Sequence, residues 1–406
     1  MTKRQRIEEA LAKRYEFRYN VLTGSIEFRG KTEATYRHHT DYDMNSIIRE
    51  IDRLGENVSE TMYTSIVKSD FTERYHPMKH YFEVFLKDLG EATGTEHIEK
   101  LAATVTVPNP EEWYLSLKRW LVASVANSLT DRGCQNHTCI VLTGPMGTFK
   151  TSWLSNLCPP LLRPDGIMTG KIDLNLANKD TFLLLGTKFI VNLDDQLRNL
   201  MKKDSETMKT LITHPEISIR RPFSKFSETL SRIANFLASI NGDEFLAENE
   251  NRRFLPFRVQ AIDLQSALEI DLNRVWNEAL TLWRSDYKYW WSKEELEAAF
   301  PDMNSFAYAS DEMEMITTHF EIPETRDRAN VTMNATEIAA YFKSKVGLML
   351  STKKIGEALK TLNAVQVKVR QGQTVLTKYA LIDADQPLSA EEIRRRHDAA
   401  LIQRLG

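Results

Sequence analysis

The chain has 406 residues, of which 42% are hydrophobic, so two or three packed domains are expected and wholesale disorder is excluded. Its 53 basic and 56 acidic side chains leave a net charge of -3, which excludes a uniformly basic nucleic-acid-binding protein and leaves room only for a local basic patch. The charged, amphipathic N-terminus and the lack of an apolar run of ~18 residues predict a cytoplasmic protein with no membrane partner.

Residues 1–107 are predicted to form a mainly helical N-terminal domain with one β-hairpin. The hairpin strands are Tyr15–Asn20 and Ser25–Arg29, which a short glycine-containing turn joins. The two prolines of Val107–Pro110 cannot lie within a continuing helix, so this segment marks the domain boundary. An amphipathic helix is predicted next, over Glu111–Ser128.

The three cysteines are too few, and odd in number, for a disulfide framework, which favours a reducing compartment. His137 lies between Cys134 and Cys139 in the sequence, which suggests zinc, while Cys158 stands apart. The spacing offers neither a C-x-x-C pair nor a second ligand pair, so a loop that leads into a buried strand is the favoured interpretation.

Residues 108–292 are predicted to form an α/β domain, with a mainly parallel sheet and flanking helices. Short apolar runs alternate there with helical segments, and a parallel sheet covered by helices produces that pattern. The runs predicted as strands are Cys139–Thr143, Lys188–Leu193, Ile217–Arg220 and Ala234–Ile240. A tryptophan-rich helical segment, residues 264–291, closes the domain.

The C-terminal part is predicted to contain a linker (293–329), a small winged-helix-like domain (330–384) and a basic terminal helix (385–406). The small domain has helices at Ala335–Val346 and Thr352–Leu362, followed by a β-hairpin of alternating valines. Because a fold does not decide function, both duplex DNA and protein contacts stay open for its cations, which are Lys353, Lys354, Lys368 and Arg370.

A glycine-containing loop follows the first strand of the central domain and leads into a helix that opens with Lys150 and Thr151. In such loops the backbone N–H groups bind phosphate oxygens, the lysine reaches the β- and γ-phosphates, and the threonine hydroxyl binds Mg²⁺. Phe149 replaces the second glycine of the usual G-x-x-x-x-G-K-[ST] pattern, so the loop alone is not specific. The expected nucleotide-binding residues are Gly144, Pro145, Met146, Gly147, Thr148, Phe149, Lys150, Thr151 and Ser152.

Two acids, Asp194 and Asp195, end the next predicted strand. After a phosphate-binding loop this pattern indicates an ATPase, in which Asp194 orients Mg²⁺ and Asp195 polarises the attacking water. The expected cofactors are therefore ATP and Mg²⁺, with Thr151 and Asp194 as the metal-binding residues. Two solvated acids at a strand end are the competing interpretation.

Asn241 ends the last predicted strand, where its amide can hold water against the γ-phosphate. This sensor position is typical of additional-strand, AAA+-like P-loop ATPases. Arg252 and Arg253 follow it and are candidates for a finger that stabilises transition-state charge, including on the nucleotide of a neighbouring subunit. A surface or packing arginine pair is the alternative. The expected catalytic residues are Lys150, Asp195, Asn241, Arg252 and Arg253.

With these residues the chain resembles the virulence-associated E family, which comprises ATPase or helicase-like proteins of phages, prophages and other mobile elements. The family is similar to superfamily III helicases, whose ATPase modules assemble as rings on DNA. The resemblance implies an ATP-driven motor or replication initiator that acts as a homo-oligomeric ring, such as a hexamer. It runs over most of the chain and includes Phe17–Asn20, Ser69–Phe71, His76–Phe82, Lys118–Val122, Gly144–Thr151, Trp153, Asn192–Asp195, Arg220–Phe223, Ser239–Asn241, Phe245, Leu246 and Asn251–Phe254.

The sequence also departs from the family. No primase-type metal cluster precedes residue 135, so primase activity would come from a separate chain. Asp195 stands where most relatives with a base have Glu, and Phe149 stands where they have Gly. Both departures bear on the turnover rate more than on nucleotide binding.

A DNA contact is expected just before the sensor strand, where superfamily III helicases place a β-hairpin that projects into the ring channel. By position, Lys225 would grip phosphate and Phe226 would stack on bases of single-stranded DNA. Arg220 and Arg221 could instead face the nucleotide across a subunit boundary. A structural hairpin with solvated charges is the alternative.

Three functions stay open on the sequence. The first is an ATPase that unwinds or remodels DNA. The second is a nucleotide-gated oligomeric switch or scaffold, with slow hydrolysis, that controls a replication or defence partner. The third is a DNA-binding module with a vestigial phosphate loop, against which the presence of Lys150, Thr151, Asp194 and Asn241 weighs.

Overall fold

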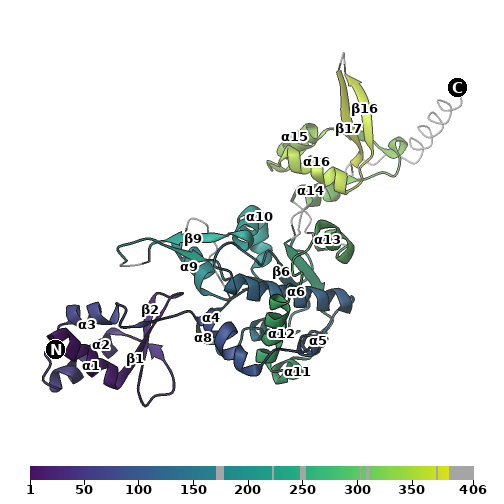
Figure 1. Cartoon of the computed structure of the whole chain (residues 1–406). Helices are drawn as coiled ribbons and strands as arrows, with labels where there is room; N and C mark the ends of the chain where they lie inside the picture. Colours follow the sequence, from purple (N-terminus) through teal and green to yellow (C-terminus); the bar gives the residue numbers. More distant parts are fainter. Residues whose placement is uncertain are drawn as a thin grey trace. The chain divides into compact units, whose positions relative to one another are not determined.

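The computed structural model describes residues 1–170, 178–221, 224–246, 253–301, 303–307, 311–371 and 374–383. The chain divides into two compact units, Met1–Phe306 and Ala307–Gly406 (Figure 1). Within the described ranges, no helix is both long enough and apolar enough to cross a membrane.

The first unit begins with a small sheet and three helices that share one core. The elements are α1 (Lys3–Arg14), β1 (Tyr15–Asn20), β2 (Ser25–Gly30), β3 (Arg37–His38), α2 (Asp41–Arg53), α3 (Glu60–Val67) and β4 (Glu73–Tyr75). The strand order is β3-β2-β1-β4. Leu11, Phe28, Ile51 and Tyr63 are buried together at its centre. The predicted hairpin is confirmed as β1–β2, whereas β3 and β4 were not predicted, because runs of two and three residues carry no periodic signal.

A helical segment connects this sheet to the central domain. It contains α4 (Pro77–Lys79), the π-helix η1 (His80–Phe85), the 3₁₀-helix η2 (Leu86–Leu89), α5 (Glu96–Ala103), β5 (Val105–Thr106) and α6 (Pro110–Leu129). The predicted helix over 111–128 is confirmed as α6, which opens with Pro110, where a missing N–H costs no hydrogen bond.

A five-stranded parallel sheet forms the centre of the first unit, in the order β12-β6-β11-β8-β7. Its strands are β6 (Cys139–Gly144), β7 (Ile167–Thr169), β8 (Ile190–Asp194), β11 (Asn235–Asn241) and β12 (Phe254–Arg258). The surrounding elements are α7 (Lys150–Asn156), α8 (Arg163–Gly166), α9 (Lys179–Thr187), α10 (Leu197–Thr213), β13 (Ala261–Ile262), α11 (Leu264–Glu269), α12 (Leu272–Arg284), α13 (Lys293–Ala299) and η3 (Met303–Phe306).

The sequence prediction of this sheet needs three corrections. The run Ile217–Arg220 does not join it, because β9 (Glu216–Ile219) pairs antiparallel with β10 (Glu228–Ser231) in a separate hairpin. The two edge strands, β7 and β12, were not predicted. Pro256 within β12 argues against a central strand but is compatible with an edge, since one side of an edge strand needs no partner. The helical segment predicted over residues 264–291 is formed by α11 and α12 and ends at Arg284, short of residue 291.

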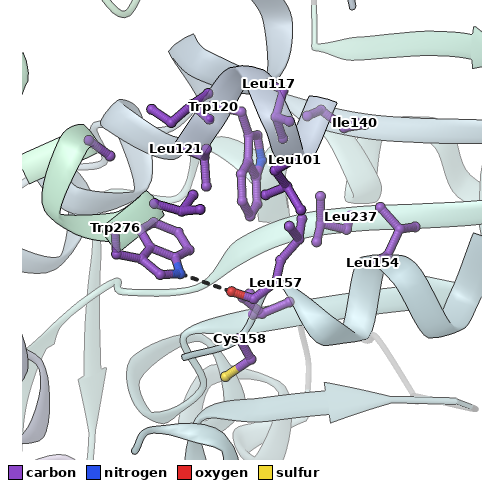
Figure 2. Close-up of a cluster of buried hydrophobic side chains, with 14 of the residues drawn as sticks. Leu101, Leu117, Trp120, Leu121, Ile140, Leu154, Leu157, Cys158, Leu237 and Trp276 are labelled. Carbon is purple, nitrogen blue, oxygen red and sulfur yellow. Dashed lines mark hydrogen bonds between the residues drawn. The ribbon is translucent and has the colours of Figure 1, made fainter. Parts of the chain in front are cut away.

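The core on one face of the sheet is rich in buried tryptophan. Each of four tryptophans also donates its indole N–H, so none leaves a buried donor unpaired: Trp113 to Ala102 O, Trp120 to Phe236 O, Trp153 to Thr104 Oγ1 and Trp276 to Leu157 O. Figure 2 shows the last of these bonds, with the Trp276 indole directed at the carbonyl of Leu157. Trp153 lies in the middle of α7 and Leu157 directly follows its last residue, so the C-terminal half of this short helix is fixed to the core.

The second unit has its own core of helices and strands. It contains α14 (Asp311–His319), β14 (Phe320–Glu321), η4 (Arg326–Arg328), β15 (Val331–Met333), α15 (Ala335–Val346), α16 (Thr352–Thr361), β16 (Gln366–Gln371) and β17 (Thr374–Asp383). The predicted capping box of α15 is confirmed, since Asn334 and Glu337 exchange hydrogen bonds. Both predicted helices and the hairpin are present, while the predicted helix over 385–406 lies outside the described residues.

Candidate functional site

Three strands of the parallel sheet end at one edge, and the predicted site residues gather there. The loop Pro145–Phe149 follows β6, Asp194 ends β8, and Asn241 ends β11. The register places Asn241 beside Gly144 and Ser239 beside Asp194. Ligand sites of open α/β sheets lie at this carboxyl edge.

Lys150 opens α7 and is buried against its own loop. Its Nζ donates to Gly144 O at 3.0 Å, to Pro145 O at 2.6 Å and to Thr148 Oγ1 at 3.1 Å. These three acceptors match the three N–H groups of an ammonium. Burial lowers the pKa of Lys150, against the opposing effect of the Asp195 and Asp194 carboxylates.

Thr151 and Asp194 are in direct contact. The Thr151 hydroxyl donates to Asp194 Oδ1 over 2.6 Å, and Ser239 Oγ donates to the same oxygen over 2.7 Å. The two hydroxyl oxygens lie 3.0 Å apart. The cluster therefore offers three oxygen atoms in mutual contact, the type of ligand that Mg²⁺ prefers.

Ser239 was not among the predicted site residues. A sequence signal was present, because Ser239 is a polar residue in an otherwise apolar strand and precedes Asn241 by two positions, which puts both on one face. Asn192 in β8 was also missed. It donates to Ser155 Oγ at 3.1 Å in α7, and its buried Oδ1 has no partner among the residues that the structure describes.

Asp195 and Asn241 form a second pair of contacting residues at the carboxyl edge of the sheet. Asn241 donates its side-chain N–H to Asp195 Oδ2 at 2.8 Å and its backbone N–H to Oδ1 at 3.2 Å. Asp195 has φ = 51°, a left-handed conformation that is uncommon outside glycine, asparagine and aspartate. Its carboxylate is thus oriented by Asn241 and keeps further lone pairs as acceptors.

Phe149 has the backbone conformation that glycine would supply. Its φ is 61°, and its side chain is 56% exposed. A left-handed residue with a Cβ costs roughly 1–2 kcal/mol, and such outliers cluster at functional sites. Gly144 is required for a different reason, because a Cβ there would lie 2.9 Å from Val259 O.

An ion pair that the sequence did not predict joins three strand ends beside the loop. Asp243 accepts from Thr143 Oγ1 at 2.8 Å and from Arg258 Nε at 2.9 Å. The Gly242 N–H also donates to Gly144 O at 3.3 Å. These contacts fix the end of the sensor strand relative to the start of the loop.

Of the two predicted finger arginines, Arg253 is not at this edge. Arg252 lies outside the described residues. Arg253 precedes β12, and its carbonyl accepts from Cys139 N at the opposite end of β6. The five-residue strand separates it from its own loop by about 16 Å. Arg253 therefore lies away from the Lys150 loop of its own chain.

The two candidate DNA-binding residues lie on the loop between β9 and β10. Lys225 is exposed, and the Phe226 side chain is 79% exposed. Arg220 donates to Ser224 O at 2.8 Å within the same loop. In the second unit, the cations at 353, 354, 368 and 370 are also exposed.

Comparison with known proteins supports the family resemblance. The family model described as the Virulence-associated protein E-like domain matches residues 86–308, which are 223 of the 406 residues. No curated protein matches the chain. Among solved structures, the apo structure of the NrS-1 C terminal region has a TM-score of 0.50 at 13% identity, over 94% of this chain and 100% of that one. A further structure, the A form apo structure of that region, has a TM-score of 0.46 at 14% identity, over 93% and 99%.

Proposed function

Since the chain belongs to the family of proteins with a virulence-associated protein E-like domain, we propose that it is an ATP-hydrolysing, helicase-like motor or replication initiator of a phage or other mobile element. The observation that carries the proposal is the contact between Thr151 and Asp194 beside Lys150, at the carboxyl edge of the sheet. These are the residue types that position a nucleoside triphosphate in P-loop ATPases.

The donor set fits Mg²⁺ and ATP. Thr151 and Asp194 would hold the metal, and Ser239 adds a second hydroxyl to the same cluster. Bound Mg²⁺ supplies charge neutralisation between the β- and γ-phosphates. The loop residues from Gly144 to Ser152 would direct backbone N–H groups at the phosphates, and Lys150 would exchange a loop acceptor for a phosphate oxygen.

Asp195 and Asn241 would act on the attacking water. The carboxylate of Asp195 accepts the proton of the water, and the Asn241 amide holds that carboxylate in place. A general base of this kind contributes about 10²–10⁴-fold to a rate. Asp is one methylene shorter than Glu, so the water must approach closely for the transfer to occur.

A ring would complete the site. Arg252 and Arg253 would supply transition-state charge to the nucleotide of the next subunit, which is consistent with the place of Arg253 away from its own loop. Lys225 and Phe226 would line the channel and bind single-stranded DNA. A homo-oligomer, such as a hexamer, and a separate primase as partner belong to the same proposal.

A nucleotide-gated switch with slow hydrolysis is the second candidate. The specific observation in its favour is Lys150, whose three N–H groups are all bonded within the loop. Such a site would respond slowly and could control a replication or defence partner through its oligomeric state rather than through turnover.

Two measurements on the full chain separate these candidates. Phosphate release from ATP is measured with and without single-stranded DNA, and particle mass is measured by light scattering with and without ATP and DNA. A motor shows DNA-stimulated hydrolysis by a large assembly, whereas a switch changes mass with ATP while its turnover ignores DNA. A parent chain that does not bind ATP in the presence of Mg²⁺ contradicts both.

A further inference from the structure

Arg221 connects the exposed β9–β10 loop to the N-terminal hairpin. Its side chain is only 11% exposed. Nη2 donates to Leu22 O at 2.8 Å and to Val21 O at 3.2 Å, both in the β1–β2 turn. Nε pairs with Glu228, the first residue of β10. The guanidinium therefore binds the turn on one side and the base of its own loop on the other.

Gly24 provides the space for this contact. Its φ is 71°, and a Cβ built there would lie 2.7 Å from both Cδ and Nε of Arg221. Real Cβ atoms do not approach other atoms this closely, so the arginine lies directly against the glycine. The left-handed conformation and the close approach are two separate reasons for glycine at this position.

The turn that receives Arg221 is itself fixed. Leu22 is buried in the same core as the four tryptophans. Asn20 Oδ1 accepts from the backbone N–H of Leu22 at 3.1 Å and of Thr23 at 3.3 Å, and Val21 N donates to Tyr75 O at 3.0 Å. Arg221 is thus attached to a rigid anchor.

Hydrogen bonds within the β9–β10 loop connect Arg221 to the exposed residues of that loop. Ser224 N donates to Arg221 O at 3.1 Å, and Ser224 Oγ donates to Phe226 O at 2.9 Å. Lys225 lies between these two residues and is exposed. A short chain of hydrogen bonds therefore leads from the N-terminal turn to the two candidate DNA-binding side chains.

The inner side of the loop is unsuited to a phosphate backbone. A hollow of about 1310 Å³ lies between the loop and the N-terminal sheet. Its lining carries three lysines or arginines but five carboxylates, which are Asp41, Glu60, Asp70, Glu73 and Glu228. Phosphates are repelled from such a surface, so the phosphate backbone would lie on the outer side of the loop, while Phe226, which also lines the hollow, could still contact a base.

We infer that Arg221 is a positioning residue that clamps the β9–β10 loop to the N-terminal hairpin and thereby sets the geometry with which Lys225 and Phe226 meet single-stranded nucleic acid. The clamp itself stands on the contacts above, whereas its consequence for nucleic-acid binding rests on the proposed function. Because the Arg221 guanidinium is bonded to groups of its own chain, it does not act as a finger on the nucleotide of a neighbouring subunit.

Hydrogen exchange tests the clamp in the full chain. Gly24→Ala and Arg221→Ala are each expected to raise exchange of the Ser224–Ser227 amides at least tenfold. Gly55→Ala is the matched control, because Gly55 has φ = 89° and no atom within 4 Å of its Cβ position, so it imposes the strain without the clash. The double variant Gly24→Ala/Arg221→Ala should exchange no faster than Arg221→Ala alone, because shortening the arginine removes the clash.

The clamp is refuted if Arg221→Ala leaves loop exchange at the parent value, or if Gly24→Ala has its full effect in the Arg221→Ala background. Gly55→Ala should leave loop exchange unchanged, and an effect equal to that of Gly24→Ala would also refute the clamp, since general strain would then explain the result.

Affinity for a single-stranded oligonucleotide tests the coupling. Gly24→Ala removes no charge, so it should weaken binding severalfold with an unchanged salt slope. If Arg221 instead bound phosphate directly, Arg221→Ala would weaken binding and lower the salt slope by about 0.7, whereas Gly24→Ala would leave binding unchanged. If the variants exchange faster but bind the oligonucleotide as tightly as the parent, the coupling is contradicted, while the clamp is still supported. A parent chain that binds no oligonucleotide contradicts the proposed function, and exchange still decides the clamp.

Discussion

Asn241 holds Asp195 by two hydrogen bonds, at 2.8 Å from its side-chain amide and 3.2 Å from its backbone N–H. Both carboxylate oxygens are therefore oriented by one residue at the end of the sensor strand. A base held in this way depends on its charge for proton transfer, while its position depends on hydrogen bonds that a neutral amide can also make.

Asp195→Asn should consequently separate chemistry from binding. The variant keeps an oxygen that accepts from Asn241, so ATP affinity should stay within about threefold of the parent while kcat falls roughly 10²–10⁴-fold. Phosphate release gives kcat, and a fluorescent ATP analogue gives Kd. Asp286→Asn is the control, because Asp286 is another left-handed aspartate, with φ = 57°, outside the site. A parent-like kcat in Asp195→Asn would show that the base has been misassigned.

Phe149→Gly should stabilise the protein relative to Phe149→Ala. Both variants remove the exposed ring, but only glycine relieves the left-handed strain at this position, which amounts to about 1 kcal/mol. Urea unfolding of the two variants measures the difference directly. Equal free energies of unfolding would mean that the loop relaxes without cost when the ring is absent.

Lys150 should make ATP binding dependent on pH. Burial lowers its pKa from the ordinary 10.5, and a bound phosphate favours the charged amine. Affinity should therefore be greatest below the folded pKa and should fall as the pH rises through it toward 10.5. In the unliganded chain the lowered pKa of Lys150 means that the charged amine destabilises the folded state. The free energy of unfolding should therefore increase as the pH rises from the folded pKa toward 10.5.

The control for that titration is Lys150→Arg, since a guanidinium stays protonated across the range. Its Kd for ATP should be higher than that of the parent but should change little with pH. If the parent and Lys150→Arg decline in parallel, another group is responsible for the pH dependence.

Lys225→Ala and Phe226→Ala should weaken single-stranded DNA binding in different ways. Loss of the lysine should lower the salt slope by about 0.7, as expected for one phosphate contact. Loss of the ring should cost about 1–3 kcal/mol with the slope unchanged, as expected for one stacked base. Lys293→Ala is the control. The Lys293 side chain lies on α13 and is 81% exposed, and removing its charge should leave DNA affinity and the salt slope unchanged. Unchanged affinity in both loop variants would exclude this loop as the DNA contact.

Trp276→Phe should destabilise the first unit by about 1–3 kcal/mol, because the buried carbonyl of Leu157 loses its donor. Trp290→Phe is the matched control, since Trp290 is 58% exposed and should change stability by no more than about 0.5 kcal/mol. Thermal unfolding of the two variants tests the difference. Similar melting temperatures would indicate that water replaces the indole at Leu157.

The part of the fold that could be predicted from the sequence is the part with a periodic or compositional signal. β6, β8 and β11 were found because central parallel strands are apolar on both faces. A hairpin at the position of β9–β10 was expected from the family resemblance and is confirmed, whereas the strand pattern assigned the run at Ile217 to the central sheet, which was wrong. Strand pairing depends on contacts between distant segments, which a local pattern does not contain.

The candidate site divides in the same way. Lys150, Thr151, Asp194, Asp195 and Asn241 stand at ends of strands or starts of helices, so parallel topology alone brings them together. Asp243 and Arg258 were missed because their pairing requires knowledge that β12 lies beside β6. The place of Arg253 at the opposite edge follows from the same unpredicted strand.

The three hydrogen bonds of Lys150 would make the proposed nucleotide binding a ligand exchange rather than an addition. A phosphate oxygen must displace a carbonyl of Gly144 or Pro145, or the hydroxyl of Thr148, and it gains only the difference between the two bonds. A phosphate oxygen carries negative charge and attracts the ammonium more strongly than a neutral carbonyl or hydroxyl does, so a polyanion would win this competition whereas an uncharged nucleoside would not. In the proposed function the loop would therefore discriminate among ligands by charge before any contact with the base is made.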